Sequence, residues 1–316
     1  MKILVISPVH EVALRRLEAE HDVVRELNPD QDQLADLVGD CEVLVMRSGV
    51  QVDAHVLRRA EHLRFVVRAG AGTDNIDMAV AGQRGIRVMT IPGPGARAVS
   101  EMAFALMLSL ARNVLEADRS LREGRWRKHE MTGRSLGGKT LGVLGAGNIG
   151  CRVGRLGAAW GMTVLGTVDR PTPAIVTALA AQGIESVSRD ELLRRSDYVS
   201  LHVPLTDQTR GLIDAEALSL MASDAYLVNL ARGGVVDEQA LYTALVEGRL
   251  AGAALDVHAV EGEGKVSPLA GLPNVVLTPH IGAGTFESQR EIGEQVLAFV
   301  HDYEAGRLAV DSMEDA

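Results

Sequence analysis

The sequence predicts an α/β protein made of two Rossmann-like, doubly wound parallel-sheet domains with a cleft between them. Three observations lead to this fold class. The chain has 316 residues, enough for two domains of ordinary size. Short apolar runs alternate with amphipathic segments, which is typical of parallel strands covered by helices. A glycine-rich turn, Gly145–Gly150, stands between one such run and a helix-like segment.

The apolar runs give the expected strands in two sets. Four precede residue 95, at 3–6, 43–46, 65–67 and 86–89. After residue 138 they resume at 140–145, 162–168, 197–203, 225–230, 252–257 and 274–277. Such short β-type runs, separated by helix-like stretches, indicate parallel sheets.

A break between the domains is expected at Thr90–Gly95, because two Pro and two Gly in six residues continue neither a strand nor a helix. A helix should follow, with Ser100 or a nearby residue as its cap. From Met102 to Ala111 this helix is apolar nearly all round. It is therefore either sunk in a large core or packed against another subunit, and we favour the subunit contact.

The tail from about residue 288 reads as a helix that could pack back onto the first domain. That domain would then be discontinuous, with residues 1–94 and 288–316, and the glycine-rich turn would lie in a domain of residues 95–287. Because the chain stops at Ala316, we expect no added regulatory domain.

Composition narrows the class of protein. The hydrophobic fraction of 47% supports a large core, and the net charge of -10 argues against broad nucleic-acid binding. No stretch approaches the roughly 20 apolar residues of a membrane span. Cys41 and Cys151 cannot form a disulfide framework and suit a reducing compartment. The apolar run Ile3–Ile6 near the start of the chain is too short for a signal peptide, so we expect a cytoplasmic protein.

The glycine-rich turn suits a cofactor pyrophosphate. Gly145 permits the tight turn, Gly147 lets the backbone approach the phosphates, and Gly150 lets the helix pack closely on the strand. The helix start, with Asn148 and Ile149, supplies free N–H groups and a positive dipole. A purely structural turn is the alternative, and the flanking strand and helix favour the cofactor.

Asp169 is the acid expected to hold the adenosine ribose, at the end of the strand that follows the turn. An acid there favours NAD, because it would repel a 2′-phosphate. Its neighbour Arg170 could instead stack on adenine or meet a 2′-phosphate. NADP therefore stays open as the second cofactor.

Three charged residues near the end of the chain lie in distinctive sequences. Arg232 lies in Asn229–Asp237, Glu261 follows the apolar run ending at Val257, and His280 ends the segment that begins at Val275. Their chemistry suits an acid/base site for an anionic substrate: histidine can exchange a proton near neutral pH, a nearby glutamate favours the imidazolium, and the planar arginine can hold an anion. Singly they could be a strand-end histidine, a solvated carboxylate and a surface arginine. In combination we interpret them as catalytic.

These phrases, with Val45–Ser48, Arg68–Asp77 and Gly137–Gly142, resemble the D-isomer-specific 2-hydroxyacid dehydrogenases over about residues 40–300, most closely their short-form phosphoglycerate dehydrogenase branch. The resemblance implies a substrate domain built from both chain ends, a nucleotide domain between them and usually a homodimer. It also implies roles for the trio: His280 as acid/base, Glu261 as its orienting carboxylate and Arg232 as the substrate-holding arginine.

Further residues follow from the motifs and the resemblance. The cofactor-binding set is expected to be Gly145, Gly147, Asn148, Ile149, Gly150, Asp169, His202, Val203, Pro204, Leu230, Ala231, Asp256, Gly282 and Ala283. Asp256 matches an acid near the nicotinamide amide. The substrate-binding set is expected to be Arg47, Ser48, Ala69, Gly70, Ala71 and Gly72. Arg134 and the stretch 126–129 could reach a neighbouring subunit's cleft.

The chain departs from the family pattern at a few positions. The ribose acid would align with Val168, one residue before Asp169, and His258 stands where Phe or Tyr is usual. Gly262 replaces a Pro after Glu261, and Gly95 replaces an Asn near the substrate. These departures concern the substrate more than the reaction class.

The sequence therefore predicts a cytoplasmic, NAD-dependent oxidoreductase that interconverts a small D-2-hydroxy acid and its 2-oxo acid. The favoured substrate carries a second anionic group, such as the phosphate of 3-phosphoglycerate or a phosphonate, and contacts Arg47. A glyoxylate or hydroxypyruvate reductase is the alternative within the class, and an NAD(H)-sensing corepressor or scaffold is the alternative outside it. The remaining histidines have no metal-ligand spacing, so we expect no metal. We expect no nucleic-acid or membrane partner.

Overall fold

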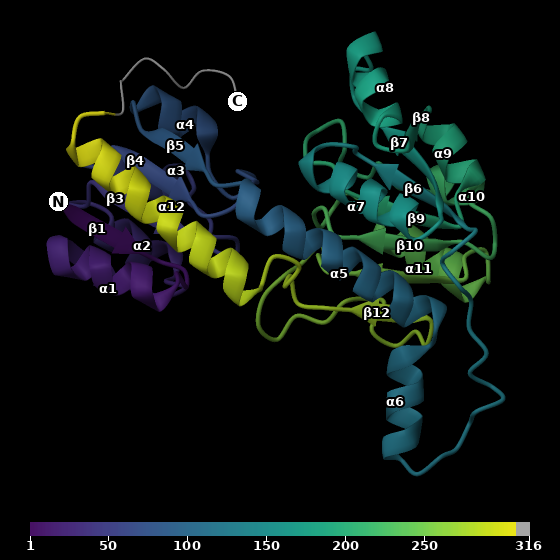
Figure 1. The fold of residues 1–316 in the computed structure, drawn as a ribbon. Coiled ribbons are helices and arrows are strands. Elements are labelled where there is room, and N and C mark those ends of the chain that lie inside the picture. The colour runs from purple at the N-terminus through teal and green to yellow at the C-terminus, as the bar shows by residue number, and fades with distance from the viewer. Residues whose placement is uncertain (308–316) are drawn as a thin grey trace. The chain divides into compact units, whose positions relative to one another are not determined.

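The computed structural model describes residues 1–307, which form two compact units (Figure 1). One unit consists of Met1–Gly95 together with the described residues from Gly284 onward, and the other of Ala96–Ala283. The sequence placed these two boundaries at residues 94 and 288. Residues 308–316 of the expected first domain lie outside the described residues.

The first unit contains a five-stranded sheet whose strands are all parallel. Its order is β2-β1-β3-β4-β5, with β1 Lys2–Val5, β2 Asp22–Arg25, β3 Val43–Met46, β4 Phe65–Arg68 and β5 Arg87–Thr90. The four expected strands are confirmed, and β2 was missed. It is an edge strand with only two consecutive apolar residues, both half-buried, so its sequence carries little signal.

Helices cover both faces of this sheet (Figure 1): α1 Glu11–Glu20, α2 Gln31–Leu37, α3 Ala54–Arg59, α4 Met78–Gln83 and α12 Phe286–Glu304. Alternate residues of β1 face opposite layers of core. Ile3 packs in the layer with α1 and α12, whereas Leu4 packs in the layer with α2 and α3. The ring of Phe299 on α12 lies 5.1 Å from that of Phe65 on β4, so the last helix belongs to the first unit's core.

The second unit contains a seven-stranded parallel sheet in the order β12-β11-β10-β9-β6-β7-β8. The bounds are β6 Thr140–Leu144, β7 Thr163–Thr167, β8 Ile184–Ser186, β9 Tyr198–Leu201, β10 Tyr226–Asn229, β11 Gly252–Leu255 and β12 Val275–Leu277. The six expected strands are confirmed. The sequence missed the three-residue edge strand β8, which is too short to give a periodic signal.

The second unit contains all but the first three residues of α5 Gly93–Ala111. Its other helices are α6 Val114–Arg122, α7 Asn148–Ala159, α8 Pro173–Ala180, α9 Arg189–Arg195, α10 Ala215–Leu220 and α11 Glu238–Val246. The strand order reverses between β6 and β9. In doubly wound sheets, ligands bind outside the carboxyl ends of the strands at such a reversal. The first unit has its own reversal, between β1 and β3.

The structure corrects the expected cap of α5 and shows what covers its apolar side chains. The helix begins at Gly93, where a proline in the first turn costs no hydrogen bond. Ser100 lies inside it and donates to the carbonyl of Arg97 at 2.6 Å, so Ser100 is not its cap. The apolar side chains from Ala103 to Ala111 are mostly buried in the core of the second unit, with Leu141 and Val143 of β6. Their apolar character therefore reflects this core and needs no second subunit.

Within residues 1–307, no single helix is long and apolar enough to cross a membrane. Only α5 and α6 taken together meet the length and composition criteria, and the pair is bent by 61°. The same residues contain no group of three or more His, Cys, Asp or Glu side chains placed to hold a metal ion.

Candidate active site

The catalytic candidates follow three neighbouring parallel strands of the second unit. Arg232 comes after β10, Glu261 after β11 and His280 after β12. The cofactor candidates follow β6, β7 and β9 and also the same three strands, β10, β11 and β12. Because parallel strands end at the same edge, the fold gathers both sets on the carboxyl-terminal edge of one sheet.

The glycine-rich turn has the geometry that a pyrophosphate requires. Gly145 has φ of +98°, and a Cβ on it would lie 2.8 Å from the carbonyl oxygen of His202. A Cβ on Gly150 would lie 2.1 Å from the carbonyl oxygen of Gly145, so only glycine lets α7 approach the strand. Gly147 meets no other atom within 4 Å, and it precedes a helix start without a side-chain cap. Open space in front of free N–H groups fits a bound phosphate.

The other cofactor candidates are placed unequally. Asn148 and Ile149 begin α7, Val203 and Pro204 follow β9, and Leu230 and Ala231 are buried after β10. Asp169 lies two residues beyond the end of β7, and its side chain is 94% exposed. Its nearest cation is Arg170 at 3.6 Å, which is 92% exposed. The chain's own contacts therefore leave the ribose acid unfixed.

His202 is held neutral by its surroundings. Its Nε2 lies 2.8 Å from Oγ of Ser200, and its buried Nδ1 has no partner within the described residues. Burial lowers the pKa of His202 to about 3. The backbone of His202, which packs against Gly145, is its link to the glycine-rich turn.

Glu261 and His280 form a direct pair. Oε2 of Glu261 lies 2.8 Å from Nδ1 of His280, and Oε1 accepts the backbone N–H of His258 at 3.1 Å. Burial raises the pKa of Glu261, but the hydrogen bond and charge of His280 and the N–H of His258 outweigh it and hold that pKa below its usual range. The carboxylate therefore stays ionised beside the imidazole at neutral pH.

His280 occupies a left-handed backbone conformation, with φ of +54°. Such a conformation costs a non-glycine residue about 1–2 kcal/mol and clusters at functional sites. Its N–H donates to the carbonyl oxygen of Asp256 at 2.7 Å, which ties the turn to the end of β11. This turn, rather than the strand itself, sets where the imidazole lies.

Asp256 is buried, and its carboxylate is used by the protein. Oδ1 accepts the hydroxyl of Thr278 at 2.6 Å and the N–H of Ile281 at 2.9 Å, and Oδ2 accepts the N–H of Gly282 at 2.7 Å. A Cβ on Gly282 would lie 2.8 Å from Oδ2, so glycine is needed for this approach. The sequence placed Asp256 near the nicotinamide amide. Its contacts in the structure shape the turn that carries His280.

The Arg232 loop is fixed by a residue that sequence reasoning did not single out. The side chain of Asn229 accepts the N–H of Ala231 at 3.0 Å and donates to the carbonyl of Arg232 at 3.1 Å. A Cβ on Gly233 would lie 1.8 Å from the carbonyl oxygen of His258, so the Arg232 loop packs directly on the loop that leads to Glu261. The signal for Asn229 and for Thr278 was a polar residue ending or following a buried strand.

The substrate candidates of the first unit follow β3 and β4. Arg47 begins the loop after β3, its N–H donates to Oγ of Ser7 at 2.9 Å, and Ser48 is half-buried beside it. This is the carboxyl end of the β1–β3 reversal. Within Ala69–Gly72, a Cβ on Gly70 would lie 1.8 Å from Nη1 of the buried Arg68, so glycine makes room for that guanidinium.

Arg134 has a partner in its own unit, Asp224, at 2.8 Å. The reach of Arg134 to a neighbouring subunit is therefore not supported by its contacts.

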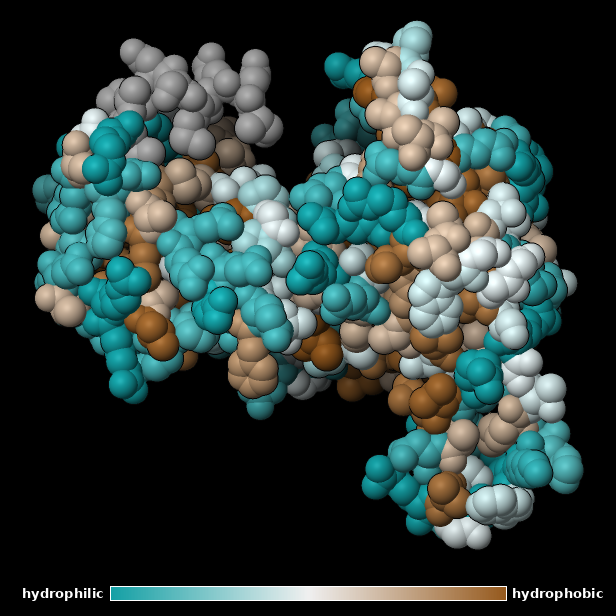
Figure 2. Space-filling view, in the orientation of Figure 1, coloured by the Kyte–Doolittle hydropathy of each residue, from teal (hydrophilic) through white to brown (hydrophobic). Residues whose placement is uncertain are grey.

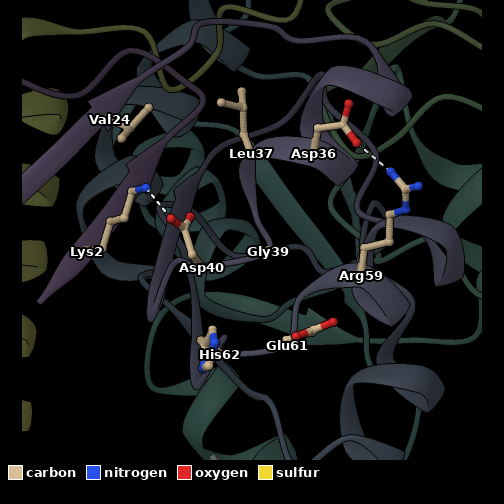
Figure 3. Close-up of a pocket in the computed structure, with 9 residues that line it drawn as sticks. All are labelled: Lys2, Val24, Asp36, Leu37, Gly39, Asp40, Arg59, Glu61 and His62. Carbon is tan, nitrogen blue, oxygen red and sulfur yellow. Dashed lines mark hydrogen bonds and ion pairs between the residues drawn. The ribbon is translucent and has the colours of Figure 1, made fainter.

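A separate depression of about 500 Å³ lies at the amino-terminal ends of β1, β3 and β4 (Figure 3). Four of its charged side chains form two pairs, Lys2 with Asp40 at 2.6 Å and Arg59 with Asp36 at 2.5 Å. It contains none of the candidate residues and lies on the opposite edge of the sheet from Arg47.

The chain is similar in sequence to known proteins. Residues 104–282 match the family model described as D-isomer specific 2-hydroxyacid dehydrogenase, NAD binding domain. The chain is 40% identical to D-3-phosphoglycerate dehydrogenase of Methanocaldococcus jannaschii over 309 residues, which are 98% of this chain and 58% of that protein. The chain thus spans little more than half the length of that relative.

Two further likenesses cover whole proteins more evenly. The chain is 42% identical to hydroxypyruvate reductase of Thermotoga maritima over 270 residues, 85% of this chain and 86% of that protein. Among solved structures, D-lactate dehydrogenase from Aquifex aeolicus, complexed with NAD and lactic acid, superposes with a TM-score of 0.88 at 30% identity over 100% of both chains.

Proposed function

The chain belongs to the D-isomer specific 2-hydroxyacid dehydrogenase family, and we propose that it interconverts a small D-2-hydroxy acid and its 2-oxo acid with NAD as the hydride carrier. The observation that carries this proposal is the Glu261–His280 pair at 2.8 Å, formed by the loops after β11 and β12, of which β11 is the neighbour of the strand before Arg232. When bound, a reduced nicotinamide supplies a hydride to the carbonyl carbon. The chain's own residues then handle the proton and the carboxylate.

His280 is the proposed acid and base. Since its Nδ1 faces Glu261, Nε2 is the nitrogen left for the substrate oxygen. In reduction Nε2 gives its proton to the oxygen that becomes the hydroxyl, and in oxidation it takes that proton back. Glu261 stays ionised throughout and stabilises the charged ring.

Arg232 is the proposed carboxylate holder. A guanidinium presents parallel N–H donors that match a carboxylate bidentately. The hydrogen bonds of Asn229 and the packing of Gly233 fix the loop from which it extends. A held carboxylate keeps the reacting carbon at one position.

The substrate class follows from Arg47. Burial lowers the pKa of its guanidinium, and no carboxylate in the described part of the chain pairs with it. A partly desolvated cation without a counter-ion favours a substrate that carries a second anionic group, such as phosphate. Similarity to a hydroxypyruvate reductase favours that smaller substrate as the second candidate.

The test is reduction of a panel of 2-oxo acids, followed by NADH and NADPH absorbance at 340 nm. The panel contains glyoxylate, hydroxypyruvate, 2-oxoglutarate, phosphohydroxypyruvate and phosphonopyruvate. We expect the highest kcat/KM with NADH and a phosphorylated or phosphonate acid, and an increase in KM for that acid in Arg47→Ala. Preference for glyoxylate or hydroxypyruvate would establish the reductase instead. Tight NADH binding without any turnover would indicate a sensor or scaffold.

We also propose that the protein is a cytoplasmic homodimer. Apolar side chains are exposed on α6 and on the segment after it, with Leu121 59% and Trp126 79% exposed. Figure 2 shows apolar residues among hydrophilic ones in the part of the surface formed by α6 and this segment. Light scattering of the purified chain tests the dimer, and a mass of about 34 kDa, that of one chain, would exclude it.

A further inference from the structure

His258 contacts all three loops that carry the proposed catalytic residues. Its backbone N–H donates to Oε1 of Glu261 at 3.1 Å, and its ring Nε2 donates to the carbonyl oxygen of Thr278, two residues before His280, at 3.0 Å. Its own carbonyl group packs against Gly233, the residue after Arg232. We propose that His258 is a positioning residue that holds Glu261 and His280 in register by joining the loops after β11 and β12. This inference rests on the proposed function.

The ring contact is the informative one. A carbonyl oxygen only accepts, so Nε2 of His258 carries the hydrogen. The carbonyl of Thr278 also accepts the N–H of His280 at 3.1 Å. One carbonyl thus receives the His258 ring and the backbone of the left-handed residue itself. Loss of the ring donor would leave the His280 turn attached to the β11 loop through Asp256 and through the Glu261 contact that it positions.

The position of Glu261 depends on the same residue. Only one of its oxygens meets His280, and the other is held by the backbone of His258. The next N–H, that of Ala259, donates to the buried Glu238 at 2.6 Å, which anchors this stretch to α11. The loop is therefore fixed on one side by Glu238 and on the other by the His258 ring. A phenyl ring would fill the space and supply no donor.

The test compares His258→Phe with His258→Gln, which places an amide N–H near the position of Nε2. We expect His258→Phe to lower kcat roughly three- to tenfold, the loss that one hydrogen bond implies, with the KM for NADH and the melting temperature nearly unchanged. His258→Gln should recover most of this loss. His62→Phe, the same change at an exposed histidine of the first unit, serves as the matched control and should leave kcat unchanged.

A double-mutant cycle separates positioning from general packing. If His258 acts through Glu261, His258→Phe should have less than a twofold effect in a Glu261→Gln background. An unchanged kcat in His258→Phe, or the same fold loss in both backgrounds, would overturn the inference.

A readout without turnover distinguishes this inference from the proposed function. In proton NMR, the Nδ1–H of His280, assigned by its absence in His280→Asn, should exchange with water faster in His258→Phe than in the wild-type chain. Equal exchange rates would overturn the role of His258 even if the chain reduced no acid. Absence of turnover in the wild-type chain would overturn only the proposed function.

Discussion

Nδ1 of His280 lies 2.8 Å from Oε2 of Glu261, and the two residues belong to loops that follow neighbouring strands of the second unit. The contact assigns the hydrogen of the neutral ring to Nδ1, because an ionised carboxylate only accepts. It also explains why the residue adopts a left-handed backbone. The turn after β12 must bring the imidazole back toward the loop after β11, and a continued strand would carry it away.

Replacing His280 should remove turnover and preserve cofactor binding. His280→Asn is the suitable variant, because the other non-glycine residues with positive φ in residues 1–307, Asn28 and Asn113, are both asparagines. Loss of an acid/base group costs about 10²- to 10⁴-fold in kcat. Steady-state kinetics and NADH fluorescence titration measure the two quantities. Near-normal turnover in His280→Asn would contradict the assignment of His280 as the acid/base group.

Two glycines of the cofactor turn should respond in opposite ways. Gly147→Ala adds a methyl group where no atom lies within 4 Å, so the chain should keep its melting temperature and lose roughly tenfold or more in NADH affinity. Gly150→Ala places a methyl group 2.1 Å from the Gly145 carbonyl, so it should lower the melting temperature itself. Calorimetry with and without NADH compares them. Unchanged affinity in Gly147→Ala would contradict pyrophosphate binding at this turn.

Asp256→Asn tests whether this residue shapes the chain or contacts the cofactor. The variant places an amide against N–H groups that now donate to the carboxylate, so we expect a loss of about 1–3 kcal/mol in the free energy of unfolding. Urea unfolding measures this loss. Thr278→Val, which removes one donor to the same carboxylate, should show a smaller decrease. If Asp256→Asn changed the KM for NADH and left stability intact, a cofactor role would be the better account.

Arg232→Lys should weaken substrate binding even though the substitution keeps the positive charge. Lysine keeps the positive charge and loses the planar pair of donors, so the KM for the 2-oxo acid should rise roughly tenfold or more, whereas the KM for NADH should stay within about twofold. Arg249→Lys, at a half-buried arginine that pairs with Glu247 away from the candidate site, is the control. Equal kinetics in Arg232→Lys and the wild-type chain would exclude bidentate carboxylate binding.

The low pKa of the buried His202 ring should make the stability of the chain depend on pH. Its pKa is about 3 in the folded chain against an ordinary value of 6.5. Between these values the unfolded ring binds a proton and the folded ring does not, so acidification favours unfolding. The contribution of the neutral His202 ring to the free energy of unfolding is fully present above pH 6.5. It falls by up to about 4 kcal/mol as the pH is lowered toward 3. Urea unfolding at pH 7 and pH 4 measures it, and His202→Gln should show a smaller difference between the two.

Much of the fold could be predicted from the chain because its signals are local. Strands such as Val43–Met46 are buried on both faces and read as apolar runs, and the glycine-rich turn carries its own steric requirements. The elements that the sequence did not predict lack such local signals. β2 and β8 are short edge strands, and α5 begins at Gly93 inside a Pro- and Gly-rich segment whose local pattern indicates a break. The subunit contact expected for α5 rested on its apolar character, which the core of the second unit accounts for by itself. An apolar helix has the same sequence pattern whether a core or a partner covers it.

The sequence by itself determined the parallel α/β class, the turn at Gly145–Gly150 and the choice of Arg232, Glu261 and His280 as candidates, since each depends on residue type and spacing along the chain. Only the tertiary structure decided how those residues are held. The left-handed turn at His280, the buried carboxylate of Asp256 and the ring contact of His258 join segments that are 20 or more residues apart. Such contacts arise when neighbouring strands align their ends, and no local pattern in the chain encodes them.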